Sequence, residues 1–267
     1  MRVLVINLDR ATERLVFQQR QLTRLGLDWE RLVAVDTATP DDRTQEYWEG
    51  WQRPMALAER ACLRSHVAAW RRVCDAGAPM LILEDDALLA ETVPSVLKAA
   101  ALVEDVDLLQ LETRGRAKRL GLESRNIGPV QMRPLYLDRA GAAGYVLWPS
   151  GAERLLAQVA LRPALADAAI ASPGLLRVWQ VVPAQIIQND MAETYGQAPG
   201  WPVDASSVSA RSHRRAAKSF AQRLRRVAAQ LQLGLRQMKG PAEWVNVPYQ
   251  GVGNPTTMMS VSGGDAP

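Results

Sequence analysis

Short apolar runs alternate with longer amphipathic stretches through most of this chain. The runs include residues 1–8, 31–35 and 80–83, where several apolar side chains stand together. Residues 12–25 and 57–76 instead carry apolar side chains at the spacing of a helix, and each of these stretches is followed by a glycine. Strands that alternate with helices build an α/β fold, and we expect a mainly parallel central sheet.

The same patterns continue toward the C-terminal part of the chain. Further expected strands cover residues 107–111, 144–148 and 175–182, and further expected helices cover 94–103 and 150–159. Residues 41–54 and 114–125 show no clear period, so we expect long loops there.

The length of 267 residues suits one large domain, or one domain with an appendage. We predict a main domain over residues 1–204 and a basic amphipathic helical segment over 205–240. The last segment, 241–267, is rich in Gly, Ser and Thr toward its end, and we expect a disordered tail there.

Cysteine content and the N-terminal sequence bear on the compartment. The two cysteines, Cys62 and Cys74, form no C-x-x-C or Cys/His cluster, which is typical of a reducing compartment. The apolar run at the start is too short for a signal peptide, and no window resembles a membrane span. We therefore expect a cytoplasmic protein, with peripheral binding to the inner membrane as an addition.

Positive charge is concentrated in one segment. Residues 205–240 hold nine Lys and Arg and no Asp or Glu, so the rest of the chain carries about −5 (+4 minus 9). Apolar residues recur there at spacings of three and four: Phe220, Leu224, Val227, Leu231, Leu235 and Met238. We interpret residues 211–240 as a helix that docks on an anionic membrane surface. The alternatives are a helix packed on the main domain and a nucleic-acid-binding segment; no aromatic pattern supports the latter, and no nucleic acid is expected.

Three consecutive acids, Glu84, Asp85 and Asp86, follow the apolar run at residues 80–83. The end of a parallel strand lies at the sheet edge where open α/β sheets bind ligands. Carboxylate oxygens suit a hard divalent cation such as Mn²⁺ or Mg²⁺, whose charge offsets their mutual repulsion. In an extended chain Glu84 and Asp86 point to one side and Asp85 to the other. The alternative is that the acids cap a following helix.

Four segments in a definite order carry a resemblance to a known family: VINLDRATERL, LRSHVAAWRRV, LILEDDA and AAGYVLWPSGAERLL. Together they resemble glycosyltransferase family 25, the lipopolysaccharide-type galactosyltransferases that include bacterial lipooligosaccharide enzymes and collagen galactosyltransferases. The similarity runs over residues 1–189. It implies a GT-A-type nucleotide-sugar-binding fold, a UDP-sugar donor and transfer with inversion.

The resemblance also implies residues for the donor and its metal. The carried-over set is Asn7, Leu8, Arg14, Asp36, Glu84, Asp85 and Asp86. Asp86 would bind Mn²⁺ or Mg²⁺, with Glu84 or Asp85 reaching the metal or the ribose; we assign Glu84 to the metal and Asp85 to the nucleotide. Arg14 would reach a phosphate or would be a solvated helix residue. Asp36 would reach the nucleoside or would cap a turn.

His66 lies in the second of these segments, and the family's glycine before it is replaced here by Ala61. Cys62, His66 and Trp70 are spaced to share one helix face. We interpret His66 as a hydrogen-bonded helix residue and rank this role above that of a catalytic base. The sequence offers no third soft ligand near Cys62 and His66, which disfavours a Cys/His metal site.

Inverting transfer requires a base that takes the proton of the acceptor hydroxyl. Asp167 matches a family aspartate and is the first candidate; Glu193 is the second, with Asp190 and Asp138 behind them. For each, a solvated loop carboxylate is the alternative.

The predicted function is transfer of a hexose, with galactose from UDP-galactose as the expected case, to a lipopolysaccharide- or lipooligosaccharide-type acceptor. The expected partners are the UDP-sugar, a glycan or glycolipid acceptor and the anionic membrane surface. The alternative is a non-catalytic nucleotide-sugar- or carbohydrate-binding protein of the same fold, because Ala61 departs from the family pattern.

Overall fold

The structure is a computed structural model that describes residues 1–138, 141–171, 175–201 and 241–251. The predicted basic helix at 205–240 and the last part of the predicted tail lie outside these residues. The strands are β1 (Val3–Asn7), β2 (Trp29–Val33), β3 (Met80–Glu84), β4 (Ala87–Leu89), β5 (Leu108–Gln110), β6 (Lys118–Gly121), β7 (Arg125–Ile127), β8 (Val130–Leu137), β9 (Gly144–Leu147), β10 (Val178–Val182), β11 (Ile186–Gln188) and β12 (Ala242–Val245).

The helices fall between these strands. They are α1 (Thr12–Arg24), α2 (Gln45–Glu49), α3 (Leu57–Ala76), α4 (Val93–Ala100), α5 (Pro149–Leu161) and α6 (Ala166–Ile170), with the 3₁₀ turns η1 (Asn189–Met191) and η2 (Glu193–Tyr195). Gly26 and Gly77 follow α1 and α3 with positive φ, as expected of helix-ending glycines. Within the described ranges, no helix is both long and apolar enough to cross a membrane.

The sheet has the strand order β12-β6-β8-β10-β5-β9-β3-β1-β2, with β7 paired to β8. β1 runs parallel to both β2 and β3, and β10 runs parallel to β5. β9 is antiparallel between β3 and β5, and β8 is antiparallel beside β10. The α/β class is confirmed, and the sheet is mixed: the expected parallel strands form one end, and antiparallel strands interleave the rest.

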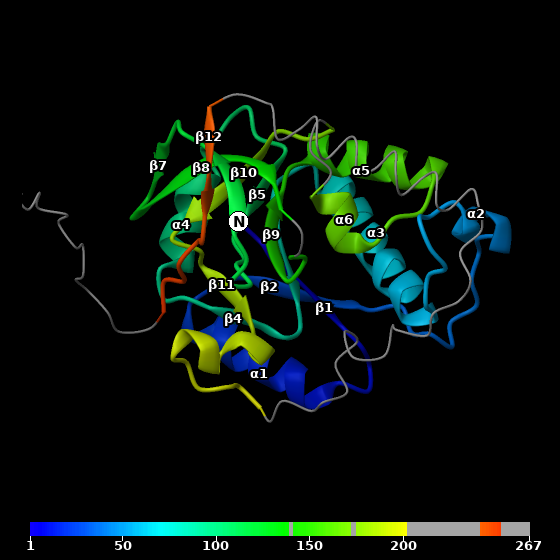
Figure 1. Cartoon of the computed structure of the whole chain (residues 1–267). Coiled ribbons are helices and arrows are strands. Elements are labelled where there is room, and N and C mark those ends of the chain that lie inside the picture. The colour runs from blue at the N-terminus through cyan, green and yellow to red at the C-terminus, as the bar shows by residue number, and fades with distance from the viewer. Residues whose placement is uncertain (139–140, 172–174, 202–240, 252–267) are drawn as a thin grey trace, which may run out of the picture.

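The two faces of the sheet bury separate apolar cores. Leu4 and Ile6 of β1 pack into one core, whereas Val3 and Val5 pack into the other, as alternation along a strand requires. The first core lies under α3, α5 and α6, which Figure 1 shows together on one side of the sheet. α1 and α4 contribute to the second core. The sheet is therefore held rigidly between two layers of helices.

Three regions differ from the sequence-based prediction. The loop expected over 41–54 contains α2, whose Trp48 is buried and whose start is capped by the Thr44 hydroxyl. The loop expected over 114–125 contains β6. Its Lys118 is only 2% exposed because its ammonium group pairs with the Asp138 carboxylate at 2.7 Å.

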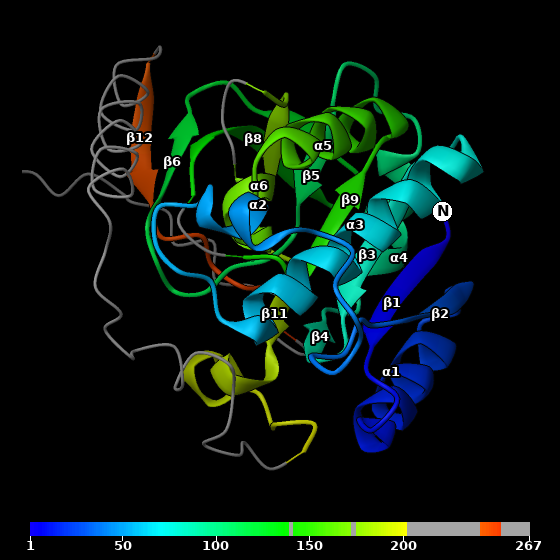
Figure 2. The same cartoon turned by 90° about the vertical axis from the view of Figure 1, so that its right-hand side faces the viewer.

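The prediction of a disordered tail over 241–267 is wrong for the first residues of that segment. Ala242–Val245 forms the edge strand β12, paired antiparallel with β6 (Figure 2). Val247, just beyond it, is buried. This segment has little periodicity of its own, and it forms a strand because its backbone pairs with one more than a hundred residues earlier in the chain.

Candidate functional site

The polar residues that follow β1, β3 and β5 meet at one edge of the sheet. β1 ends on Asn7 and β3 ends on Glu84, and the two strands are parallel neighbours. Glu112 follows β5, which is separated from β3 only by β9. Since β9 is antiparallel, its start at Gly144 lies at this same edge. The fold thus gathers Asn7, the acids Glu84, Asp85 and Asp86, and Glu112 at the carboxyl edge, as expected for a ligand site of an open α/β sheet. We call this group of residues the acid edge.

Asp85 and Asp86 form a turn that leads directly into the strand β4, and we call it the acid turn. The alternative that the acids cap a helix is therefore wrong. β4 pairs with β11 in a separate two-stranded sheet, so the acid turn connects two strands of different sheets. Gln18 of α1 fixes this turn by donating to the backbone carbonyls of Asp85 and Ala87 at 3.1 and 2.7 Å. A turn held on both sides presents its side chains in fixed directions.

Asp85 is fully engaged by neighbouring side chains. The Asn7 side-chain amide donates to its Oδ2 at 2.7 Å, and the Arg14 guanidinium donates to its Oδ1 at 3.1 Å. Arg31 in turn donates to the Asn7 side-chain oxygen at 3.0 Å. Burial raises the pKa of Asp85, while Arg14 and Asn7 act in the opposite direction. The structure thus brings three predicted donor residues, Asn7, Arg14 and Asp85, into one hydrogen-bonded cluster.

Glu84 lies beside α3, away from that cluster. Its Oε1 is 3.1 Å from His66 Nε2, and its Oε2 accepts from the Gln188 amide at 3.2 Å. His66 Nδ1 lies 2.9 Å from the hydroxyl of Tyr145, which also accepts from Trp70 Nε1. A carboxylate only accepts and an indole N–H only donates, so a neutral His66 carries its proton on Nε2 and accepts from Tyr145 on Nδ1. The predicted hydrogen-bonded role of His66 is borne out by this chain of contacts.

Asp86 has few partners. Its Oδ1 is buried and has no hydrogen-bond partner among the described residues. Burial and the neighbouring charges of Glu84, Asp85 and Glu112 raise the pKa of Asp86 well above its usual range. A buried carboxylate oxygen without a donor is costly unless something else supplies positive charge.

Glu112 is a second buried acid with an unfilled oxygen. The side chain is fully buried, its Oε2 accepts from the Ala143 backbone N–H at 2.8 Å, and its Oε1 has no partner within the described ranges. Burial raises the pKa of Glu112 to about 8, against the lowering effect of Lys118. Gly141 has a φ of +129° and its position leaves only 3.0 Å between an added Cβ and Glu112 Oε2, so a glycine is required there.

The start of β9 is packed equally closely. A Cβ on Gly144 would lie 2.3 Å from Ile186 Cδ1, so any larger residue would push β11 outward. β11 also carries Gln188, the donor to Glu84. The absence of a side chain at Gly144 therefore lets β9 lie close to the strand that carries Gln188.

Asp167 lies on α6, which packs against α3. Its Oδ1 accepts from the Ala168 backbone N–H at 2.7 Å. Burial raises the pKa of Asp167, and the charges of Glu84 and Asp138 raise it further, while His66 lowers it. The charge of Glu84, at the acid edge, thus influences the pKa of Asp167.

The remaining predicted residues have other surroundings. The Asp36 carboxylate accepts from the Ala38 backbone N–H at 2.9 Å and pairs with Arg10, which agrees with the turn-capping alternative. Leu8 contributes a backbone carbonyl that accepts from Ala11 at 2.9 Å. Glu193 is exposed in η2 and makes no side-chain hydrogen bond or ion pair with the described residues. The two weaker base candidates are paired, Asp190 with Arg114 and Asp138 with Lys118.

Sequence reasoning missed three residues at the edge, Glu112, Gln188 and Lys118, and it used Tyr145 only as part of a family motif. Glu112 had a signal in the sequence, because it directly follows the predicted strand at 107–111, as Glu84 follows the predicted strand at 80–83. Gln188 and Lys118 had none, since their roles depend on strand pairings that join distant parts of the chain.

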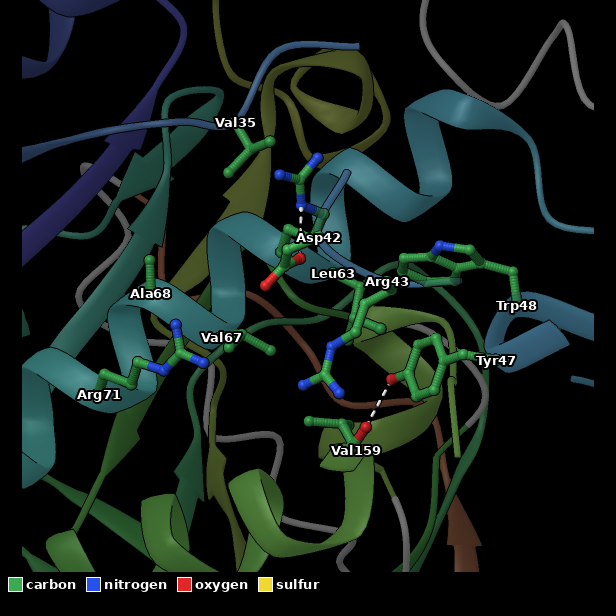
Figure 3. A pocket seen from close by; sticks show the side chains of 11 residues that line it. Val35, Asp42, Arg43, Tyr47, Trp48, Leu63, Val67, Ala68, Arg71 and Val159 are labelled. Carbon is green, nitrogen blue, oxygen red and sulfur yellow. Dashed lines mark hydrogen bonds and ion pairs between the residues drawn. The ribbon is translucent and has the colours of Figure 1, made fainter. Parts of the chain in front are cut away.

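A cavity of about 170 Å³ lies on another face of α3 (Figure 3). It is lined by α3 residues that include Arg64 and Arg71 and by Tyr47 of α2, whose hydroxyl contacts the Val159 carbonyl. Arg64 already donates to backbone carbonyls of the neighbouring loop. This cavity is separate from the acid edge, which faces Cys62 and His66 on α3.

The family model of glycosyltransferase family 25 (LPS biosynthesis protein) matches residues 1–170. A glycosyltransferase 25 family member from Anopheles gambiae is 29% identical over an alignment of 173 residues, and the match covers 58% of this chain. The match covers 28% of that protein, so this chain corresponds to about a quarter of its relative.

A solved structure, the inositol-1-phosphate CTP transferase from T. maritima, aligns with a TM-score of 0.34 and 12% identity. The alignment covers 70% of this chain and 69% of that one. This similarity is too low to assign a fold. The family match includes β1, the acid turn, the start of β9 and Asp167, which are the elements that build the acid edge and its surroundings. The chain therefore belongs to glycosyltransferase family 25.

Proposed function

We propose that this chain is a glycosyltransferase with a GT-A-type fold that transfers a hexose with inversion. The proposed donor is UDP-galactose, and the proposed acceptor is a lipopolysaccharide- or lipooligosaccharide-type glycan. Family membership supports the reaction class. The observation that carries the proposal is the acid turn after β3, where Asp86 presents a buried carboxylate oxygen that has no donor among the described residues.

Glu84 and Asp86 are the proposed metal ligands. The donor set suits a hard divalent cation, Mn²⁺ or Mg²⁺, because carboxylate oxygens are its preferred protein ligands. The unpaired Asp86 Oδ1 and the crowding of acids around it fit a positive ion that would relieve both. Glu84, Asp85 and Asp86 do not form a compact group of three ligand atoms, so phosphate oxygens would have to supply further ligands. The cation, when bound, neutralises charge that develops on the leaving diphosphate.

The proposed nucleotide-binding residues are Asn7, Leu8, Arg14, Asp36 and Asp85. Arg14 is about half exposed although it pairs with Asp85, so part of its guanidinium remains available to a phosphate. The Asp85 carboxylate accepts hydrogen bonds from both Arg14 and Asn7, and this supports a role in positioning for Asp85. Asp36 has the weaker support because its carboxylate already caps a turn.

Asp167 is the proposed base, and Glu193 is the second candidate. As base, Asp167 would accept the proton of the acceptor hydroxyl while that oxygen bonds to the anomeric carbon and the sugar–phosphate bond breaks. Burial raises the pKa of Asp167, which makes its carboxylate a stronger proton acceptor. Glu193 is exposed and lacks this feature.

We further propose a cytoplasmic location with peripheral binding to an anionic membrane through residues 211–240. This part rests on the sequence alone, since it lies outside the described residues. Each Lys or Arg near such a surface contributes on the order of 1 kcal/mol, and salt screens the attraction. Replacement of Arg223, Arg225 and Arg226 by Gln should weaken co-sedimentation with phosphatidylglycerol vesicles at low salt and less at high salt. A wild-type chain that stays in the supernatant at low salt would contradict the membrane role.

The function is tested by a transfer assay with UDP-hexoses on a lipooligosaccharide acceptor, with and without Mn²⁺. Metal-dependent transfer of galactose is the expected result. UDP-sugar binding without transfer or hydrolysis would instead favour the non-catalytic binding protein. An unchanged rate in EDTA would overturn the metal-dependent mechanism.

A further inference from the structure

Three side chains with metal-binding atoms lie together between α3 and β3. Within the described ranges, the ligand atoms of Cys62, His66 and Glu84 all lie within 4.8 Å of one another. Cys62 and His66 stand one helical turn apart on α3, and Glu84 comes from the end of β3. The sequence lacked a third ligand near the first two; folding brings it from a separate strand.

We propose that Cys62, His66 and Glu84 form a binding site for a borderline-soft divalent cation of the Zn²⁺ type. The ligand set of one thiolate, one imidazole and one carboxylate is typical of zinc, whereas Mn²⁺ and Mg²⁺ favour oxygen alone. Zinc bond lengths of about 2.0–2.3 Å require tetrahedral ligands roughly 3.5 Å apart. His66 Nε2 and Glu84 Oε1 are 3.1 Å apart and every pair of ligand atoms lies within 4.8 Å, so small shifts of the side chains bring all three to this separation.

The surroundings hold two of the ligands in place. His66 Nδ1 faces the Tyr145 hydroxyl at 2.9 Å, and Trp70 Nε1 donates to that same oxygen. Gln188 donates to the oxygen of Glu84 that does not face His66. A hydrogen bond to the far nitrogen of a ligating histidine fixes its ring and its tautomer, and such partners are common around metal sites.

Cation binding requires a defined movement of protons. Cys62 must release its thiol proton to solvent, because the thiolate is the ligand. His66 stays neutral, and its proton moves from Nε2 to Nδ1, where it is donated to the Tyr145 oxygen. The Nε2 lone pair and Glu84 Oε1, which share a hydrogen bond in the metal-free chain, then both face the cation. One proton is therefore released for each cation bound.

The site has a consequence for the proposed transferase because Glu84 belongs to both sites. A Zn²⁺ ion held by Cys62 and His66 would draw Glu84 toward α3 and away from Asp86. Zn²⁺ is thus expected to inhibit Mn²⁺-dependent transfer. This consequence rests on the proposed function, but the site itself does not.

Cobalt provides a direct probe, because a Co²⁺–thiolate bond gives a charge-transfer absorption band in the near ultraviolet. The full chain is stripped with a chelator and titrated with Co²⁺. We expect a band that saturates at about one Co²⁺ per chain and disappears when Zn²⁺ is added, since Zn²⁺ binds more tightly than Co²⁺. No band in the wild-type chain would overturn the proposal.

The second cysteine of the chain is a matched control. Cys74 lies in the last turn of α3, and both cysteines are free. Cys62→Ser and Cys62→Ala should each abolish the band, whereas Cys74→Ser should retain it. Circular dichroism checks that the variants are folded. A band that survives both Cys62 substitutions would place the thiolate ligand elsewhere and sink the proposal.

Two further variants separate the site from its surroundings and from the transferase. Tyr145→Phe removes the partner of His66 and should weaken Co²⁺ binding by about 10–100-fold. Asp86→Asn should leave the band intact while it removes Mn²⁺-dependent UDP binding. A band without any transferase activity would support the zinc-type site and refute only the proposed function.

Discussion

Asp85 and Asp86 are consecutive residues at the end of one strand, but their environments differ sharply. Asp85 accepts hydrogen bonds from Asn7 and Arg14, and its backbone carbonyl accepts from Gln18. Asp86 has a buried side-chain oxygen with no partner among the described residues. Burial raises both pKa values and the Arg14 charge lowers both, but only the Asp85 carboxylate also has its pKa lowered by hydrogen bonds, from Asn7 and Arg14.

The difference separates two uses of a buried acid. A carboxylate such as that of Asp85, whose oxygens accept hydrogen bonds from the protein, holds its neighbours in place. For Asp85 these neighbours are the end of β1 and the start of α1. A carboxylate with an unfilled oxygen destabilises the folded chain until a ligand supplies charge, which is typical of functional sites. We therefore infer that Asp85 positions the site and that Asp86 binds the cation.

The largest effect is expected from Asp86→Asn. Removal of a metal ligand should reduce transfer on the order of 10³-fold or more, because a bound metal contributes several kcal/mol to the transition state. The side chain lies at the sheet edge, so the fold should be preserved. Transfer assays at saturating Mn²⁺ measure the loss. A wild-type transfer rate in this variant would show that Asp86 is not a required metal ligand.

Asp167→Asn comes next. Proton removal belongs to the transition state, so turnover should fall by about 10²–10⁴-fold while UDP affinity changes little. Steady-state kinetics together with UDP titrations separate the two quantities. If both fall equally, Asp167 supports donor binding or structure, and Glu193 becomes the next base to test.

The pH dependence of stability tests Glu112, the other acid with an unfilled oxygen. In the folded chain its pKa is raised to about 8 from the ordinary 4.5, so the protonated form is favoured by folding. Glu112 therefore contributes its full stabilisation at pH values below its pKa in the unfolded chain. This stabilisation is lost as the pH rises through its pKa in the folded chain. The metal-free chain should therefore lose stability between about pH 5 and 8, and Glu112→Gln should flatten this slope.

Thermal melts in EDTA across this pH range provide the measurement. Glu123→Gln is a suitable control because the Glu123 side chain is 62% exposed. An unchanged slope in Glu112→Gln would show that Glu112 is ionised in the folded chain.

The smallest expected effect is on unfolding free energy in the absence of metal. Asp85→Asn breaks the contacts with Asn7 and Arg14 and should cost about 1–3 kcal/mol. Asp86→Asn removes an unpaired buried charge and should be neutral or stabilising. Urea unfolding of both variants gives the comparison, and an equal destabilisation would mean that the two acids have the same structural role.

The acid edge was largely predictable, because its signals are local. Strands that end at Asn7 and at Glu84 can be recognised from apolar runs, and parallel pairing places their ends together. Alternation along an extended chain also predicted that Asp85 would face away from Glu84 and Asp86. The separate contacts of Asp85 with α1 and of Glu84 with α3 agree with this for Glu84. Asp85 and Asp86 themselves lie in a turn, where strand alternation does not apply.

The partners of the acids were much less predictable. His66 and Glu84 meet because α3 packs on the sheet, and Gln188 reaches Glu84 only because β11 pairs with β4. The strands β6 and β12 lack clear apolar patterns, since β6 buries Lys118 through an ion pair and β12 is an exposed edge. Such contacts depend on pairings between distant segments, for which a single sequence has no local signal.

The central claim is that Asp86 binds a metal that the donor requires, whereas Asp85 does not. Calorimetric titration of UDP into the chelator-stripped chain, with and without Mn²⁺, tests it most directly. We predict that wild type and Asp85→Asn bind UDP more tightly with Mn²⁺, and that Asp86→Asn shows no response to the ion. Equal UDP binding by the wild-type chain in Mn²⁺ and in EDTA, or a retained Mn²⁺ response in Asp86→Asn, would contradict the account.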